Sequence, residues 1–269
     1  SSRREPRGRR PRIPLTMPLL RDFRFAARML ARNKGWTAVA VLALALGLGA
    51  NIAIFSTVGL MLWPPLPYPE PRQLVFLPQT NAERGFTRAA SSLMDARDWG
   101  EAGSMAAYAS FRTRPMALSG LDEPQHLPAM QVTPGFFETL RVYPALGRAF
   151  SKDETPETEA RVAIISHELW QGMFRGEAVL GREIRLDGRN YSIVGVMPAG
   201  FRFLHEPRDV WVPLSLPAGE RERGWRGLNA LGRLKPGVTP AQAAAEVRAI
   251  SERVEKEDPK NGRGWRGDV

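Results

Sequence analysis

Ser166, His167 and Glu168 are the side chains of this sequence that come closest to a catalytic pattern. His167 and Glu168 open an HExxH-like string, in which two histidines on one helix face would bind zinc and the glutamate would act as a base. Position 171 is a glutamine, so the second zinc ligand is missing. Ser166 and His167 are neighbours that project in different directions and have no third member nearby, so we expect Ser166 to cap a helix instead.

The remaining chemistry-bearing side chains do not combine into another site. His126 and His205 stand close to prolines and far apart in sequence, which is typical of loop or surface histidines. Four carboxylates fall in a Thr- and Pro-rich stretch where solvated charge is the expected state and a calcium site has no support: Asp153, Glu154, Glu157 and Glu159. The string GxxxxGK followed by Ser or Thr is absent, which excludes a P-loop ATPase. We expect no catalytic, cofactor-binding or metal-binding residue.

Residues 37–62 form an uncharged run of about 26 residues, and prolines follow it. A helix of that length reaches about 39 Å, against roughly 30 Å for the hydrocarbon core of a bilayer. A secretory signal has a shorter apolar run of about 7 to 15 residues with a small-residue cleavage site. A central helix of a soluble domain rarely exceeds about 18 residues without a charge. The sequence therefore predicts a membrane span at residues 36–63.

Most of the positive charge precedes this run. The chain carries 38 Lys plus Arg, 28 Asp plus Glu and a formal net charge of +10. Residues 1–18 are rich in Arg and Pro without aromatic side chains to stack on bases, which predicts a disordered basic extension and excludes nucleic acid as a partner.

Residues 19–35 fit an amphipathic helix on the inner membrane surface. By the positive-inside rule, five residues keep this end cytoplasmic and the chain after about residue 63 outside: Arg21, Arg24, Arg28, Arg32 and Lys34.

Within the predicted span, Ala43, Gly47 and Asn51 recur at four-residue spacing and share one helix face. Small side chains let another helix approach closely, and an amide needs a partner inside hydrocarbon. The stripe predicts helix packing against further spans, either in partners or beyond Val269.

The region after residue 63 has the pattern of an α+β domain. The chain has no cysteine, so no disulfide can stabilise this domain. A domain of about 200 residues is large enough for its hydrophobic core alone to stabilise it. Residues 105–118 and 125–132 fit paired strands, followed by a short helix that Thr133 caps and Pro134 opens. Residues 162–165 fit a strand before the helix that Ser166 caps.

Two further signals mark the second half of this region. Residues 183–186 and 191–196 flank Asp187 and Gly188, a pair favoured in tight hairpin turns. Residues 239–257 carry the clearest helix outside the span, with a Thr239 and Gln242 capping box and Pro240 at the first helical position.

Several longer stretches, in order, carry a family resemblance. They include LLRDFRFAARMLARNKGWTAVAVLALALGLGANIAIFSTVGLMLWPPLPYPEP, VTPGFFETLRVYPALGRAF, RVAIISHELWQGMF, VLGREIRLDGRNYSIVGVMPAGFRF, DVWVPL and RLKPGVTPAQAAAEV. The sequence resembles FtsX-like ABC transporter permeases with a MacB-type periplasmic core domain, in the duplicated-permease (ADOP) branch. The resemblance implies an N-terminal transmembrane helix followed by a periplasmic α+β domain over residues 64–269. That domain would hold a porter-like part, residues 70–146 and 218–269, and a sabre-like insert, residues 147–217.

The resemblance also implies a role and partners. The chain would be the N-terminal part of a non-catalytic permease subunit in a bacterial inner membrane, coupling a cytoplasmic ABC ATPase to the periplasmic domain by mechanotransmission. ATP would bind the separate ATPase, and a periplasmic partner is possible. Members of the family continue with further spans, and in the duplicated branch with a second permease unit, so we expect this chain to be a fragment. The alternatives are a single-span sensor or adaptor and, less well supported, a membrane-tethered hydrolase; the substrate stays open.

Overall fold

The structure, a computed structural model, describes residues 28–30, 32–62, 68–119 and 125–269. Within these ranges, the side chains of residues 40, 50 and 52–62 are outside the description. The chain divides into two compact units, Ser1–Pro65 and Leu66–Val269, here called the helical unit and the C-terminal unit. The predicted basic extension, residues 1–18, lies outside the described residues.

The helical unit contains α2, Lys34–Leu62, a helix of 29 residues. The predicted interfacial helix at 19–35 is described at residues 28–30 and 32, which are helical, and from Lys34 onward. Among the described residues, no helix has the length and apolar character needed to cross a membrane. The membrane span predicted at 36–63 is therefore not shown by the structure.

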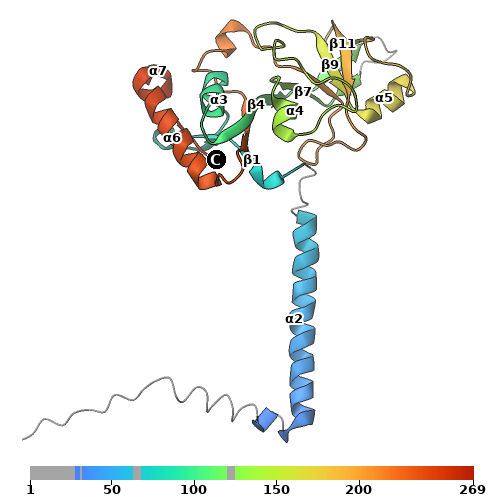
Figure 1. The fold of residues 1–269 in the computed structure, drawn as a ribbon, viewed down its shortest axis with the longest axis vertical. Coiled ribbons are helices and arrows are strands. Elements are labelled where there is room, and N and C mark those ends of the chain that lie inside the picture. The colour runs from blue at the N-terminus through green and yellow to red at the C-terminus, as the bar shows by residue number, and fades with distance from the viewer. Residues whose placement is uncertain (1–27, 31, 63–67, 120–124) are drawn as a thin grey trace, which may run out of the picture. The chain divides into compact units, whose positions relative to one another are not determined.

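The C-terminal unit mixes short helices with two sheets (Figure 1). Its helices are η1 (Pro71–Gln73), η2 (Ala82–Arg84), α3 (Leu93–Gly100), α4 (Phe136–Leu140), α5 (His167–Phe174), η3 (Ala218–Glu220), α6 (Pro240–Glu257) and α7 (Pro259–Gly262). Its strands are β1 (Leu74–Phe76), β2 (Gln79–Asn81), β3 (Phe86–Ala89), β4 (Met105–Thr113), β5 (Met116–Ser119), β6 (Gln125–Leu127), β7 (Ala129–Val132), β8 (Leu146–Gly147), β9 (Val162–Ile165), β10 (Glu183–Leu186), β11 (Arg189–Val196), β12 (Val210–Pro213), β13 (Asn229–Leu234) and β14 (Arg266–Gly267). The predicted α+β class is confirmed.

Eleven of the described strands form one mixed sheet in the order β1-β13-β4-β7-β12-β9-β11-β10-β5-β6, with β8 beside β11. Strands β4 and β5 stand far apart in this order, yet only two residues separate them in the chain, so the sheet must curl to bring them together. A core cluster packs side chains from β5, β9, β10 and β11 together. A second cluster, on the side of α4, is aromatic and includes Phe111, Phe136, Phe137 and Trp211. A three-stranded sheet, β14-β2-β3, completes the unit.

The sequence signals with local causes match the structure. Strand β9 occupies the predicted residues, and β10 and β11 form the antiparallel hairpin through Asp187 and Gly188. The capping box of Thr239 and Gln242 is present at the start of α6. These three predictions are confirmed.

The predicted cap of the helix after β7 is wrong. The N-cap of α4 is Gly135, two residues later than expected. The Thr133 hydroxyl instead accepts a hydrogen bond of 2.9 Å from the backbone N–H of Ser110 on β4. Thr133 therefore fastens the chain to the sheet before the helix begins.

The sheet continues across the predicted boundary between porter-like and sabre-like parts. Strand β12 pairs in parallel with β7 and antiparallel with β9, so the strands of the predicted insert form one block within a hydrogen-bonded path whose other strands belong to the porter-like part. The subdomain division at residues 147 and 217 stays a prediction.

Candidate functional site

The sequence-derived catalytic candidates do not form a site. The Ser166 hydroxyl accepts a hydrogen bond of 3.0 Å from the N–H of Leu169, which confirms that Ser166 caps α5. It also lies 3.5 Å from Asp209 Oδ1. Burial raises the pKa of Asp209, and the contact with Ser166 opposes that rise. The His167 ring stands edge-on to Trp170 at 5.5 Å. Within the described residues, no hydrogen bond joins Ser166 to His167.

Among the described residues, no group of three or more His, Cys, Asp or Glu side chains is placed to hold a metal ion. His126 and His205 are both exposed, on β6 and in the loop before β12.

The residues predicted to anchor or pack in the membrane all belong to the helical unit. Arg21 and Arg24 are outside the described residues, whereas Arg28, Arg32 and Lys34 are exposed. Ala43, Gly47 and Asn51 are likewise exposed on α2, and a Cβ built on Gly47 would meet no atom within 4 Å. Their roles in orientation and helix packing stay predictions.

The C-terminal unit holds its own first described residues tightly. Residues 68–70, here called the lead-in segment, begin with Tyr68, which is only 5% exposed. Its hydroxyl donates to the carbonyl oxygen of Arg202 at 2.9 Å and accepts from the N–H of Leu204 at 2.8 Å. The ring lies 6.4 Å from the Phe201 ring and joins the aromatic core cluster. Burial raises the pKa of Tyr68, and the hydrogen bond from the N–H of Leu204 opposes that rise.

A buried arginine on β13 holds the other end of the lead-in segment. Arg233 is 1% exposed, and its guanidinium donates to three backbone carbonyls: Thr139 at 2.6 Å, Pro69 at 3.2 Å and Glu70 at 3.3 Å. Burial and the nearby Arg141 lower the pKa of Arg233, while Glu70 opposes the shift. An arginine stays protonated in proteins, so a full positive charge is held in the core by carbonyl dipoles.

Backbone conformation places a second contact beside this arginine. Glu70 adopts a left-handed conformation, with φ of 49°, as the N-cap of η1, and Pro71 supplies the first helical position. Arg141 is also left-handed, with φ of 55°, where α4 ends. The two side chains form an ion pair. The lead-in segment is therefore tied to β13, to the end of α4 and to residues 201–204; we call these contacts the clamp.

The far end of the chain is tied to the same region. The N–H of Asp268 donates to the carbonyl oxygen of Pro78 at 2.9 Å, and β14 pairs with β2. Val75 and Val269 pack against one core cluster, and Figure 1 shows the C-terminus beside β1. Because β13 pairs with both β1 and β4, the clamp joins the lead-in segment directly to the large sheet.

A comparison with protein families places the chain. The family model for the MacB-like periplasmic core domain matches residues 37–250, most of the sequence. The chain belongs to this MacB-like family. The resemblance to ABC transporter permeases carrying such a domain is thereby confirmed, and the finer placement in the duplicated branch stays a prediction. Among curated proteins, none matches the chain.

Solved structures share the fold of this MacB-like domain at low sequence identity. The extracellular domain of the noncanonic ABC-type transporter YknZ from Gram-positive bacteria is 13% identical, with a TM-score of 0.53, over 73% of this chain and 100% of that one. The periplasmic region of MacB from Actinobacillus actinomycetemcomitans is 12% identical, with a TM-score of 0.53, over 72% and 87%. A domain of a putative permease protein from Porphyromonas gingivalis is 18% identical, with a TM-score of 0.55, over 74% and 90%.

Sequence reasoning missed the clamp of this MacB-like domain. Arg233 reads as an ordinary exposed cation, because arginine is almost never fully buried without a partner. A usable signal existed in the sequence: Arg233 is the only charge in the strand NALGRL, and Leu231 and Leu234 place apolar side chains on both of its faces.

Proposed function

We propose that this chain is the part of an ABC transporter permease that carries movement between the cytoplasmic and outer sides of a bacterial inner membrane. Residues 36–63 would span the bilayer with the N-terminus inside, and the C-terminal unit would lie in the periplasm or outside the cell. A separate cytoplasmic ABC ATPase would supply the energy. The permease itself would carry no catalytic site or cofactor, and its displaced outer unit would export or extract a substrate.

The observation that carries the proposal is the clamp, found in a chain of the MacB-like family. A unit that responds to movement of the preceding helix needs a stiff connection at its first residues. Within the C-terminal unit, the side chains of Tyr68 and Arg233 make five hydrogen bonds that hold residues 68–70 against β13, the end of α4 and residues 201–204. Packed interiors have low compressibility and transmit displacement, so a pull on residues 68–70 would reach β13 and α4.

Topology can be tested with single cysteines, because the native chain has none. We expect a membrane-impermeant maleimide applied to spheroplasts to label Glu252→Cys, on the exposed side of α6, and to spare Ser2→Cys. Permeabilisation should make both sites reactive. Labelling of Ser2→Cys in intact spheroplasts, or protection of Glu252→Cys, would contradict the orientation.

Coupling can be tested by hydrogen exchange in the chain reconstituted with its ATPase. ATP should change the exchange of β13, and Tyr68→Phe should reduce that change while the rate of ATP hydrolysis stays within about twofold. The substitution keeps the ring and removes two hydrogen bonds, at a cost of about 1 to 2 kcal/mol. Tyr191→Phe is the matched control, because the Tyr191 hydroxyl makes no hydrogen bond among those described.

An unchanged ATP response in Tyr68→Phe would remove the clamp from the mechanism. If cysteine labelling confirms the topology but the chain stimulates no ATPase, the function of a single-span sensor or adaptor would explain the architecture better than that of a permease.

A further inference from the structure

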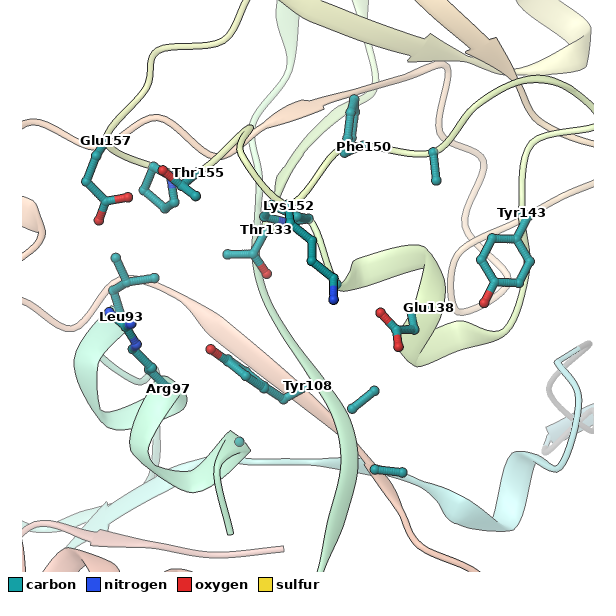
Figure 2. Close-up of a pocket in the computed structure, with 17 residues that line it drawn as sticks. Leu93, Arg97, Tyr108, Thr133, Glu138, Tyr143, Phe150, Lys152, Thr155 and Glu157 are labelled. Atoms are coloured by element: carbon teal, nitrogen blue, oxygen red, sulfur yellow. The ribbon is translucent and has the colours of Figure 1, made fainter.

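A pocket of about 700 Å³ opens between α3, β4 and α4 of the C-terminal unit (Figure 2). Strand β4 forms its floor, α3 and residues 133–138 form two walls, and residues 149–157 close part of the remaining side. Its volume falls within the range of about 300 to 1,000 Å³ typical of small-molecule sites. It takes no part in the clamp.

Small residues keep the floor of the pocket open. Ala106 and Ala107 are only partly covered on β4, in a strand whose other positions carry larger side chains or are buried. Gly100 and Gly135 leave room for Tyr108: a Cβ on Gly100 would overlap the Tyr108 ring, and one on Gly135 would lie 2.6 Å from the Tyr108 carbonyl oxygen. Gly100 thus lies against the half-buried Tyr108 ring and Gly135 against the Tyr108 backbone, and the ring provides a flat apolar surface inside the pocket.

The walls carry charged side chains of both signs, and most of them form no ion pair among the described residues. Among the described ion pairs, none involves Lys152, Glu138 or Glu157. Arg97 meets only Glu101, at 3.7 Å, with side chains 71% and 70% exposed, an arrangement that contributes little. Figure 2 shows Lys152 reaching from the loop into the space between Thr133 and Glu138. Two cations and two carboxylates therefore line one cavity with a net charge near zero.

The backbone of β4 is paired on one side at the pocket. Strand β4 pairs with β13 along residues 105–111, whereas it pairs with β7 only at residues 111–113, beyond the residues that line the pocket. Pro134 and Pro156, which also line the pocket, have no N–H to offer. The walls themselves offer a ligand side-chain charges and apolar contact.

We propose that this pocket binds a small amphipathic zwitterion, a molecule with a flat apolar body that carries one cationic and one anionic group. The apolar body would lie on Tyr108 and the alanines of β4, the anion would meet Lys152, and the cation would meet Glu138. A ligand of one sign would leave the opposite charges of the walls unmatched. The inference does not depend on the proposed coupling function.

The test uses the full chain in lipid nanodiscs and four forms of one probe, the dipeptide tryptophyl-phenylalanine. The free dipeptide carries both charges, its N-acetyl form only the anion, its C-terminal amide only the cation, and the doubly capped form neither. Titration calorimetry should give a dissociation constant of about 1 mM or tighter for the free dipeptide. Each cap should weaken binding by about threefold to fivefold, the range of a single exposed ion pair.

Variants assign each charge to its wall. Lys152→Met should remove the penalty of the amide cap alone, and Glu138→Gln should remove the penalty of the acetyl cap alone. Lys260→Met and Glu252→Gln, exposed positions on α7 and α6, are the matched controls and should change neither. Ala106→Phe should fill the floor and abolish binding, with the melting temperature reporting that the fold survives.

Three results would overturn the inference: no binding of the free dipeptide at about 10 mM, equal binding of all four forms, or unchanged binding to Ala106→Phe in a folded protein. Each is independent of the ATP response of β13, so failure here leaves the clamp untouched and failure of the clamp leaves the pocket untouched.

Discussion

The Nε of Arg233 donates to the carbonyl oxygen of Thr139 at 2.6 Å, and the two residues are 1% and 0% exposed. Thr139 lies in the last turn of α4, where carbonyl oxygens have no partner within the helix and carry partial negative charge. Together with the carbonyls of Pro69 and Glu70, it stabilises a buried cation without any direct carboxylate contact. The contact joins a central strand, a helix end and the lead-in segment in one group.

We expect Arg233→Met to lower the free energy of unfolding by about 2 kcal/mol. Methionine fills similar space but leaves three carbonyls without their donor, which destabilises the fold. Removing the buried charge also removes the cost of its desolvation, and this offsets part of the lost free energy. Urea unfolding gives the free energy, and hydrogen exchange at residues 68–70 should rise. Arg248→Met, which breaks an exposed pair with Asp268, should cost under about 1 kcal/mol. Equal effects of the two variants would show that Arg233 does not hold the segment.

Ser251 is a second residue whose side chain joins three elements, α3, α6 and β14. Its hydroxyl accepts from Trp99 Nε1 at 3.2 Å and from the N–H of Gly267 at 2.9 Å, and donates to the carbonyl of Val247 at 2.8 Å. Ser251→Ala leaves two buried donors unsatisfied, so thermal unfolding should show a loss of about 2 to 3 kcal/mol. Ser151→Ala, on an exposed loop, is the control. A loss of similar size at both positions would contradict this role.

Signals that act within a few residues made much of the fold predictable from sequence. The turn of Asp187 and Gly188 requires positive φ at both positions, 47° and 75°, and the residue types that tolerate this are few. Thr239 and Gln242 satisfy each other's backbone N–H groups within one turn. The turn and the capping box each depend on residues within a few positions of one another, so both can be recognised from the sequence alone.

The order of the sheet and the two candidate sites depend on contacts between distant residues. Strand β12 enters between β7 and β9, about 80 and 45 residues away in the chain, and no local pattern encodes that choice. The Arg233 contacts join residues 94 and 163 positions apart, and the pocket appears only when α3, β4 and α4 come together. Thr133 shows the converse: its preference for a cap was overridden by a partner on β4.

Acidification should weaken the contact between α6 and the C-terminal strand. The N–H of Gly264 and then the guanidinium of Arg266 lower the pKa of Glu255 below its ordinary value of 4.5. A depressed carboxyl pKa stabilises the fold at pH values above the ordinary pKa, and that contribution is lost as the pH falls through the folded-state value. The native chain should therefore exceed Glu255→Gln in stability at about pH 7, with the difference shrinking toward about pH 3.

Urea midpoints at several pH values measure this difference. Glu257→Gln is the matched control, because its pair with Arg253 is 3.9 Å long and both side chains are mostly exposed. A difference between the native chain and Glu255→Gln that stays constant with pH would mean that Glu255 acts through its shape and not through its charge.

The stripe on α2 gives a test that uses two alanines of the same helix. Ala43 belongs to the stripe with Gly47 and Asn51, whereas Ala45 lies about 200° around the helix from Ala43. If the stripe packs against further spans, Ala43→Ile should reduce assembly with partner helices and Ala45→Ile should not, because the added bulk blocks close approach on one face alone.

Asn51→Leu should insert normally yet impair assembly or transport, and Asn51→Gln should retain part of the function by keeping an amide. Crosslinking in membranes measures assembly; equal crosslinking of Ala43→Ile and Ala45→Ile, with unimpaired Asn51→Leu, would leave the stripe without a packing role.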